Sequence, residues 1–533
     1  MEEKIVESPT LPSDFLKIEK ISIYQRILKG CEEHLDSVIM IDAVSGEELS
    51  VRTLLSRSKI IAAKLQALGC KQGRVVGIMC ENRLEYLVIL LAILGTGATA
   101  VCFNYLYSTG ELEHTLSITK PYIVFVNSHV SEQLRRIKPS CATFKFVIQL
   151  DSQPADSSSL SYNDILKNPG KSELIVPEFV SDYPAIILFS SGSTGLPKGV
   201  MMSNGSLVFL TSYLSLSHLV SQSSKQILLS VIPLFHGYGI LISLQALMSG
   251  YTMIVVKKFN GDLFLSSIER YKVTSLSLVP PLMNFFAKHP LVDNYDLSSL
   301  ETVSCGAAPL SASVEKAVKE RLKLKKFITG YGMTETTMVC TSTVLNDYYK
   351  AGTVGKLLFG MKGKVVDLET GEALGPNKEG ELWFKGSLLM MGYYGNEKET
   401  NNTIDKDGWL HTGDVGYYDE DGDFFIVDRI KDLIKYKGFQ VAPAELEALL
   451  LQHPAIADAA VVGIPDEVAG EVPKGFVVKK GQITEKEILD YISEKVAPHM
   501  KIRGGITFVD EIPRNTNGKI LRRVLRASVK AKL

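Results

Sequence analysis

Residues 185–199 read AIILFSSGSTGLPKG, an apolar run that leads directly into small and polar residues. The apolar part, AIILF (185–189), predicts a buried strand, because short uninterrupted apolar runs suit strands that are covered on both faces. In proteins that alternate strands with helices, glycine-rich turns after such strands bind phosphate groups through exposed backbone N–H groups. The stretch therefore predicts an α/β protein with a phosphate-binding loop over SSGSTGLPKG (190–199).

This loop does not follow the Walker A pattern, in which Gly-Lys-Ser/Thr comes after the second glycine. A flexible Gly/Ser linker is the alternative interpretation. Linkers are rarely placed between a buried strand and an apolar helical run, and such a run follows residue 199. The context therefore favours a phosphate-binding loop.

Helical and strand patterns alternate along most of the 533 residues, which predicts a layered α/β architecture. EELSVRTLLSRSKIIAAKLQALG (47–69) has apolar residues at helical spacing and predicts a helix. Uncharged residues 86–103 are long enough to cross a membrane, but two glycines divide them. We predict a buried helix, a turn and a buried strand there, with a membrane helix as the alternative. Further buried strands are predicted at 74–80, 226–232, 251–256 and 275–279.

The pattern changes after about residue 428. The lysine-rich segment DRIKDLIKYKG (428–438) follows a predicted strand, DFFIV (423–427). Two helices and one strand are predicted beyond it, at 442–452, 484–496 and 457–464, respectively. We therefore predict a large domain over residues 1–428 and a small mobile domain over residues 429–533.

Composition narrows the possible partners. The chain is 45% hydrophobic and 22% charged with a formal net charge of −1, so neither nucleic acid nor an anionic membrane is expected as a partner. The seven cysteines form no CxxC pair, which argues for buried free thiols rather than disulfides or a metal site. The last residues, AKL (531–533), are close to the C-terminal SKL address of peroxisomal import. They predict an import receptor as a partner and a peroxisomal location, with a chance match as the alternative.

Four more motifs follow the phosphate-binding loop: GYGMTETT (330–337), GWLHTGD (408–414), DRIKDLIKYKGFQVAPAELE (428–447) and PRNTNGKILRR (513–523). In this order and across nearly the whole chain, the five motifs resemble those of the acyl-adenylate-forming superfamily. The match is closest to beetle luciferases and their fatty acyl-CoA synthetase relatives, and more distant to plant coumarate-CoA ligases. The resemblance implies a large N-terminal domain of layered sheets and helices, covered by a small C-terminal α+β lid.

The resemblance also implies a reaction in two steps. A carboxylate attacks the α-phosphate of ATP, pyrophosphate leaves, and the thiol of CoA then cleaves the acyl-AMP. Because two anions must meet in the first step, catalysis depends on charge neutralisation and alignment, which explains why no catalytic triad or metal-ligand cluster stands out in the sequence.

Resemblance assigns most of the nucleotide contacts. Tyr331 is expected against the adenine, Thr334 at the α-phosphate, Glu335 at Mg²⁺, and Asp414 at the ribose hydroxyls with Arg429 nearby. A helix N-cap is the alternative for TETT, and a surface turn for HTGD. The remaining contacts are expected in the phosphate loop and at backbone positions near the ligand: Ser190, Ser191, Gly192, Ser193, Thr194, Gly195, Lys198, Gly306, Ala307 and Gly332.

Two lysines of the small domain are expected to act in turn. Lys519 resembles the family lysine that bridges the substrate carboxylate and the α-phosphate, although a lone lysine in a basic tail is ordinarily solvated. Lys435 resembles the lysine on the opposite face, which serves the second step after the domain rotates about a hinge at Lys431. Gly438 would let the pantetheine arm of CoA pass close to the backbone.

IPLFHGYGI (232–240) resembles the family segment that lines the acid-binding cavity, through His236 and Tyr238. A histidine packed among apolar neighbours for structural reasons is the alternative. Ala307 stands in place of the second glycine of a more usual pair, close to the ligand, and would narrow the cavity.

Three positions separate this chain from beetle luciferases. Those enzymes usually carry a second histidine, an arginine and a serine where this chain has Phe235, Leu210 and Met338. An alkyl chain would gain about 0.8 kcal/mol for each CH₂ buried in such a pocket, whereas an unpaired polar group would lose stability. We therefore predict a ligase for medium- or long-chain fatty acids or related apolar acids. A luciferase is the alternative, and a non-catalytic acyl or nucleotide sensor is a third interpretation.

Overall fold

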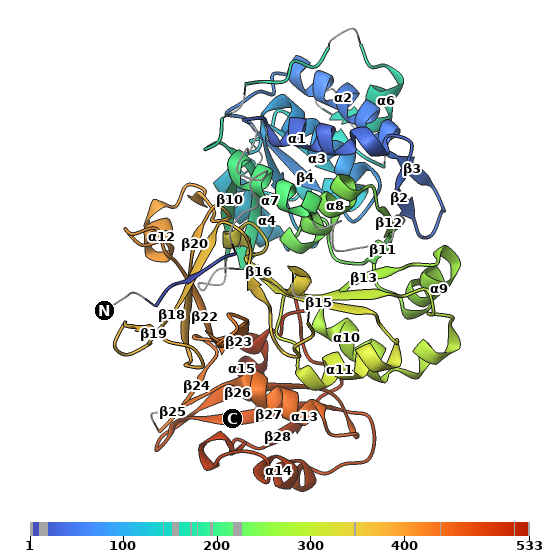
Figure 1. Cartoon of the computed structure of the whole chain (residues 1–533). Helices are drawn as coiled ribbons and strands as arrows, with labels where there is room; N and C mark the ends of the chain where they lie inside the picture. The colour runs from blue at the N-terminus through green and yellow to red at the C-terminus, as the bar shows by residue number, and fades with distance from the viewer. Residues whose placement is uncertain are drawn as a thin grey trace.

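The computed structural model describes residues 4–9, 20–141, 143–151, 159–170, 173–178, 180–191, 196–216, 226–345, 348–437, 439–515 and 518–530. In this part of the chain, four sheets and the helices that flank them form a layered structure, with the C-terminal residues at the bottom of Figure 1. The predicted α/β architecture is confirmed.

One sheet has the strand order β21-β10-β9-β5-β4-β6-β7-β8, and its strands from β9 through β5, β4, β6 and β7 to β8 are parallel. The strands are β4 (Val75–Met79), β5 (Thr99–Cys102), β6 (Ile123–Val126), β7 (Phe146–Gln149), β8 (Ser159–Ser161), β9 (Pro184–Ser191), β10 (Pro197–Ser203) and β21 (Gly392–Tyr393).

The second sheet has the order β17-β16-β15-β14-β13-β11-β12-β2-β3 and is parallel from β15 to β2. Its strands are β2 (Val38–Asp42), β3 (Glu48–Ser50), β11 (Ile227–Ser230), β12 (Thr252–Val255), β13 (Ser275–Leu278), β14 (Thr302–Cys305), β15 (Lys326–Tyr331), β16 (Thr341–Ser342) and β17 (Lys356–Leu357). The carboxyl ends of parallel strands form the edge where α/β proteins bind ligands.

Helices cover both parallel sheets (Figure 1). They are α1 (Ile23–Cys31), α2 (Val51–Ala67), α3 (Glu85–Thr96), α4 (Thr109–Thr119), α5 (Ser128–Leu134), α6 (Tyr162–Lys167), α7 (Asn204–Leu216), α8 (Gly237–Ser249), α9 (Gly261–Tyr271), α10 (Pro280–Lys288) and α11 (Ala312–Arg321).

A third, antiparallel sheet is built from β1 (Val6–Glu7), β18 (Met361–Val366), β19 (Ala373–Leu374), β20 (Gly380–Gly386), β22 (Leu410–Tyr418) and β23 (Phe424–Arg429), with α12 (Glu397–Thr403) beside it. The C-terminal unit contains β24 (Ile434–Tyr436), β25 (Phe439–Val441), β26 (Ile456–Asp466), β27 (Gly470–Lys479), β28 (Ile506–Phe508), α13 (Pro443–Leu451), α14 (Glu485–Ser493) and α15 (Arg522–Lys530). It has its own apolar core, centred on Ile434, Leu446 and Val461. The proposed domain boundary at 428/429 falls within β23, one residue before it ends.

The long apolar stretch 86–103 forms a buried helix and a buried strand, as predicted. α3 ends at Gly97, which takes a left-handed conformation (φ 75°), and β5 follows. Among the described residues, no helix is both long and apolar enough to span a bilayer.

The element that follows the predicted phosphate-binding loop is a strand and not the predicted helix. The apolar run after it forms the strand β10, which pairs antiparallel with β9 and with β21, and α7 begins only at Asn204. Val200 and Met202 of β10 are buried, and two-sided pairing explains why an apolar run forms a strand here. The loop therefore closes a hairpin instead of leading into a helix. The predicted helix at 47–69 likewise begins later, at Val51, because residues 48–50 pair with β2 and Ser50 caps the helix.

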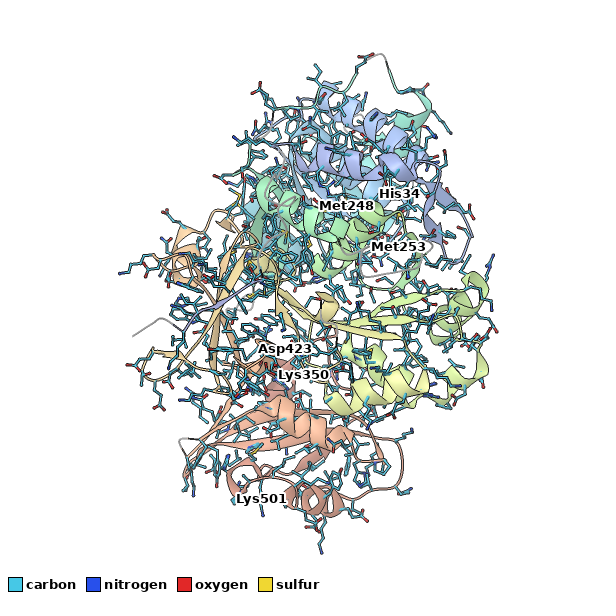
Figure 2. The ribbon with its side chains drawn as sticks, in the orientation of Figure 1. His34, Met248, Met253, Lys350, Asp423 and Lys501 are labelled. Carbon is cyan, nitrogen blue, oxygen red and sulfur yellow. The ribbon has the colours of Figure 1, made fainter. Side chains whose placement is uncertain are left out.

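An ammonium group lies among three carboxylates at the turn between β22 and β23. The Nζ atom of Lys350 is 2.7 Å from Asp419, 2.6 Å from Asp421 and 3.1 Å from Asp423, whose side chain is fully buried. Figure 2 labels Lys350 and Asp423, which lie side by side. The three carboxylates lie close enough together to hold a metal ion, but Lys350 already supplies a compensating charge.

Gly250 ends α8 with φ 65°, and a Cβ atom there would lie 2.5 Å from Cγ of the His34 ring, labelled in Figure 2. We predict that Gly250→Ala lowers the thermal unfolding midpoint more than Gly371→Ala does. Gly371 has a similar φ of 71° but open space around its Cα, so its substitution reports backbone strain alone, about 1 kcal/mol. The clash at Gly250 should add roughly 1–3 kcal/mol. Equal midpoints for the two variants, measured by scanning calorimetry, would contradict this packing.

Candidate active site

A cavity of about 1010 Å³ opens at the carboxyl ends of the parallel strands β13, β14 and β15. Helix α8 lines it too, as do Arg514, Asn515, Gly518 and Lys519 of the C-terminal unit. It is lined by many of the residues that the sequence singled out: His236, Tyr238, Gly306, Ala307, Tyr331, Gly332, Thr334, Met338 and Lys519. The fold thus brings together side chains from motifs up to about 280 residues apart in the sequence.

Tyr331, which is expected against the adenine, lines one end of the cavity, whereas Asp414 and Arg429, which are expected at the ribose, are not among its lining residues. The Tyr331 hydroxyl donates a hydrogen bond of 2.7 Å to Oδ2 of Asp414, which is 7% exposed. Arg429 lies beside the same carboxylate, with its Nε atom 3.4 Å from Oδ1. Burial, followed by the charge of Asp414, raises the pKa of Tyr331 well above its usual value, so the phenol remains a donor.

Beside this end, Glu335 links two strands. Its Oε1 atom accepts hydrogen bonds of 2.9 Å from the hydroxyls of Ser190 at the end of β9 and Tyr393 of β21. Glu335 is 5% exposed, and a buried carboxylate beside a phosphate-binding hairpin is the type of ligand that Mg²⁺ takes together with nucleotide phosphates.

Lys198, on β10, forms an ion pair with Glu399 of α12 and lies 5.1 Å from the ring centroid of Tyr393. Neither Glu399 nor Tyr393 was predicted from the sequence. The segment GYYGNEKET (392–400) gave only a weak signal, a charged helix start after two tyrosines.

Several predicted contacts cannot be placed. Gly192, Ser193, Thr194, Gly195 and Gly438 lie outside the described residues, as does the tail AKL (531–533). Ser191 ends β9, opposite Pro197 of β10.

Lys519 reaches the cavity from the C-terminal unit. Its backbone N–H donates to Oδ1 of Asn515, which closes the loop, and Gly518 packs against Pro281 at the start of α10. Burial, and next the charge of Arg429, lowers the pKa of Lys519 to about 8, while Asp414 and Glu335 oppose this shift. The ammonium is therefore surrounded by the groups assigned to the nucleotide.

Lys435 lies elsewhere. It is exposed in the middle of β24, between β25 and β27, and does not line the cavity. In this arrangement, therefore, Lys519 lines the cavity and Lys435 does not.

The acid-binding end contains His236 and Tyr238, as expected. Burial, and next the charge of Lys519, lowers the pKa of His236 to about 3, so its imidazole is neutral at ordinary pH. Leu210 differs from the prediction, because it is fully buried in the core and does not line the cavity. Tyr213 and Leu214, one turn further along α7, line the wall instead, because only the last turn of that helix reaches the cavity.

Comparison with known proteins agrees with this geometry. Residues 28–394 match the family model of AMP-binding enzymes, and residues 445–519 match that of the AMP-binding enzyme C-terminal domain. The chain is 42% identical to a probable 4-coumarate–CoA ligase 3 of Dictyostelium discoideum, over 94% of each chain. It is 39% identical to the luciferin 4-monooxygenase of Nipponoluciola cruciata, over 97% of this chain and 96% of the other.

A peroxisomal OPC-8:0-CoA ligase 1 of Arabidopsis thaliana is 37% identical, over 93% of this chain and 91% of the other. Among solved structures, ATP-bound MatB from Rhodopseudomonas palustris superimposes with a TM-score of 0.85 at 27% identity, over 96% of this chain and 99% of that chain.

The pKa of Lys519 gives a prediction for nucleotide affinity. Because a lysine with a lowered pKa loses its charge as pH rises through about 8, the attraction of the empty site for ATP should weaken above that pH. We expect the dissociation constant for ATP, measured calorimetrically, to rise by up to tenfold between pH 7.5 and 9.5. Lys519→Arg, which keeps its charge throughout, should flatten the profile. A flat profile in the unmodified protein would show that Lys519 does not titrate in this range.

Proposed function

Because the chain belongs to the AMP-binding enzyme family, we propose that it is an AMP-forming acid–CoA ligase, whose substrate is a medium- or long-chain fatty acid or a related apolar acid. The observation that carries this proposal is the position of Lys519, inside a cavity that also contains Tyr331, Thr334 and His236. A positive charge at the junction of a nucleotide site and an acid site is what the union of two anions requires.

In the first step, a carboxylate oxygen of the acid attacks the α-phosphorus of ATP, and the bond from that phosphorus to the pyrophosphate oxygen breaks. Lys519 and the Thr334 hydroxyl are positioned to neutralise and orient the α-phosphate. The hydroxyl of Ser190 and the ammonium of Lys198 belong to the hairpin that would hold the β- and γ-phosphates. Asp414 would bind the ribose, and the Tyr331 ring would lie against the adenine.

Glu335 is the residue that would hold Mg²⁺, since a single carboxylate together with phosphate oxygens is a common set of protein and substrate ligands for this ion. The ion would supply charge neutralisation at the phosphates. Ser190 and Tyr393, which donate to Glu335, orient its carboxylate.

In the second step, the sulfur of CoA attacks the acyl carbonyl carbon, and the bond from that carbon to the AMP oxygen breaks. Because Lys435 does not line the cavity, we propose that this step follows a rotation of the C-terminal unit about the connection between β23 and β24, which contains Lys431. Gly438 would then allow the pantetheine arm to pass.

The two lysines provide a direct test. Lys519→Ala should reduce acid-dependent pyrophosphate release by at least about 100-fold, because the charge at the reacting phosphate is lost. The same variant should retain thioester formation from supplied acyl-AMP. Lys435→Ala should show the opposite pattern and serves as the matched control. Equal losses of both half-reactions in either variant would contradict this division of labour.

The apolar acid is supported by apolar side chains that line the cavity, which include Leu214, Leu241, Ile242 and Met338. A luciferase remains the second candidate, favoured by the 39% identity to luciferin 4-monooxygenases. Purified protein with luciferin, ATP and Mg²⁺ in a luminometer distinguishes the two. Faint light is compatible with a ligase, and bright emission would replace this proposal by the second candidate.

We also propose that AKL (531–533) directs the protein to peroxisomes through the import receptor, with support from the resemblance to the SKL address and from one relative that is named as peroxisomal. Deletion of Leu533 should leave an N-terminally tagged protein diffuse in the cytosol, while the tagged full chain is punctate. Punctate fluorescence in the truncated protein would mean that the tail does not carry the address.

A further inference from the structure

The strands that form the floor of the cavity have an unusual composition for their position. β13 reads SLSL and β14 reads TVSC, so small hydroxyl residues alternate with apolar ones. Strands of a parallel sheet that is covered on both faces are ordinarily apolar on both. Here the apolar positions, Leu276, Leu278, Val303 and Cys305, pack in one core, and the other positions, Ser275, Ser277, Thr302 and Ser304, line the cavity.

Three of the hydroxyls that line the cavity form one hydrogen-bonded cluster. Ser304 Oγ lies 3.1 Å from the hydroxyl of Tyr238 and 3.1 Å from Oγ of Ser277, its direct neighbour across the sheet. Ser304 Oγ also lies 3.3 Å from the carbonyl oxygen of Leu276, to which it can donate. Because Tyr238 comes from α8 and the serines from the sheet, the cluster spans two walls of the cavity.

The cluster has more acceptor capacity than protons. Each hydroxyl carries one proton and two lone pairs. Ser304 donates its one proton either to Oγ of Ser277 or to the carbonyl oxygen of Leu276, and it can accept a hydrogen bond from Tyr238. Lone pairs on Tyr238 and Ser277 remain available beside the cavity, where a ligand hydroxyl could donate to them.

Apolar side chains line the same cavity. They include Leu214 of α7 and Leu241 and Ile242 of α8. Methylene groups can therefore pack in the cavity while an oxygen on the same chain meets the cluster.

The depth of the cluster defines where that oxygen would lie. Ser304 lies in β14, two residues before Gly306, which also lines the cavity, so Ser304 lies about 7 Å further from the carboxyl ends of the strands than Gly306 does. A group at this depth belongs to an interior carbon of the acyl chain and not to the carbon next to the carboxylate.

We propose that the acid activated at this site carries a hydroxyl group on an interior carbon of its chain, and that Tyr238, Ser277 and Ser304 bind this hydroxyl. The inference rests on the proposed ligase function and deepens it, because it names a class of hydroxylated acyl substrates.

The experiment compares straight-chain octanoic, decanoic and dodecanoic acids with derivatives that carry one hydroxyl at successive carbons. Pyrophosphate release gives kcat/KM for each acid. At one interior position, the hydroxylated acid should exceed its parent by roughly 3- to 10-fold, which corresponds to one added hydrogen bond. A preference for the unsubstituted parent at every position would overturn the inference.

Variants of the cluster test whether its hydroxyls cause the preference for the hydroxylated acid. In Ser304→Ala and in Tyr238→Phe, the ratio of kcat/KM for the preferred hydroxy acid to that for its parent should fall to about one. Ser275→Ala is the matched control, because it removes a hydroxyl from the same cavity, on the neighbouring strand β13 but outside the cluster, and the ratio should persist. The ratio is measured within one preparation, so a loss of folded protein does not mimic the effect. A ratio unchanged in both cluster variants would also overturn the inference.

A binding measurement separates this inference from the proposed function. Calorimetric titration of the same acid pair, in the presence of AMP, requires no turnover. Tighter binding of the hydroxy acid without pyrophosphate release from any acid would refute the ligase and support the hydroxyl site. Pyrophosphate release with equal binding of the pair would support the ligase and refute the hydroxyl site.

Discussion

The arrangement around the cavity depends on one buried positive charge. Lys519 is carried into the site on a loop from the C-terminal unit, where burial and Arg429 both favour its neutral form. Asp414 and Glu335, which belong to the large domain, favour the charged form. The carboxylates that partly compensate this charge therefore lie across the interface between the two parts of the molecule, which makes the interface itself part of the environment of Lys519. An ammonium that is incompletely compensated in this way is well suited to receive a triphosphate.

Other groups at the nucleotide end are already paired within the protein. Lys198 contacts Glu399, Ser190 donates to Glu335, and Tyr331 donates to Asp414. Under the proposed function, binding of a nucleotide would exchange these internal partners for phosphate and ribose oxygens. The affinity is therefore a difference between two sets of polar interactions and not a sum of new ones. The internal partners also hold the side chains close to their working positions before the ligand arrives, which reduces the entropy lost on binding.

Much of the fold could be predicted from the sequence, because apolar periodicity reports burial directly. The strands β4, β9 and β13 and the helix–turn–strand at residues 86–103 were predicted correctly. The antiparallel strand β10 was missed, since a short apolar run has no period that distinguishes a strand from a helix when its pairing partners are distant in the sequence. The prediction that Leu210 lines the acid-binding cavity was wrong for a related reason. The resemblance identifies the helix but does not show which of its turns reaches the cavity.

The candidate site was predictable where a motif carries it and unpredictable where contacts between elements create it. Lys519 and Tyr331 stand in recognisable motifs. By contrast, the pairing of Lys198 with Glu399 joins residues about 200 positions apart, and the cluster of Ser277, Ser304 and Tyr238 combines three elements. The alternation in SLSL was visible in the sequence, but only the neighbouring strand TVSC shows that both polar faces meet in one cavity.

The lysine among the aspartates at the β22–β23 turn has a consequence of its own. Acidic turns of this kind in other proteins draw a divalent ion from solution, so their order varies with the supply of that ion. Here the counter-ion is the ammonium group of Lys350, which is part of the polypeptide and is therefore present once in every molecule. The ion pairs at the start of β23, the strand that leads towards the interdomain connection, therefore form whether calcium is scarce or abundant. A chelator does not remove the lysine that makes them.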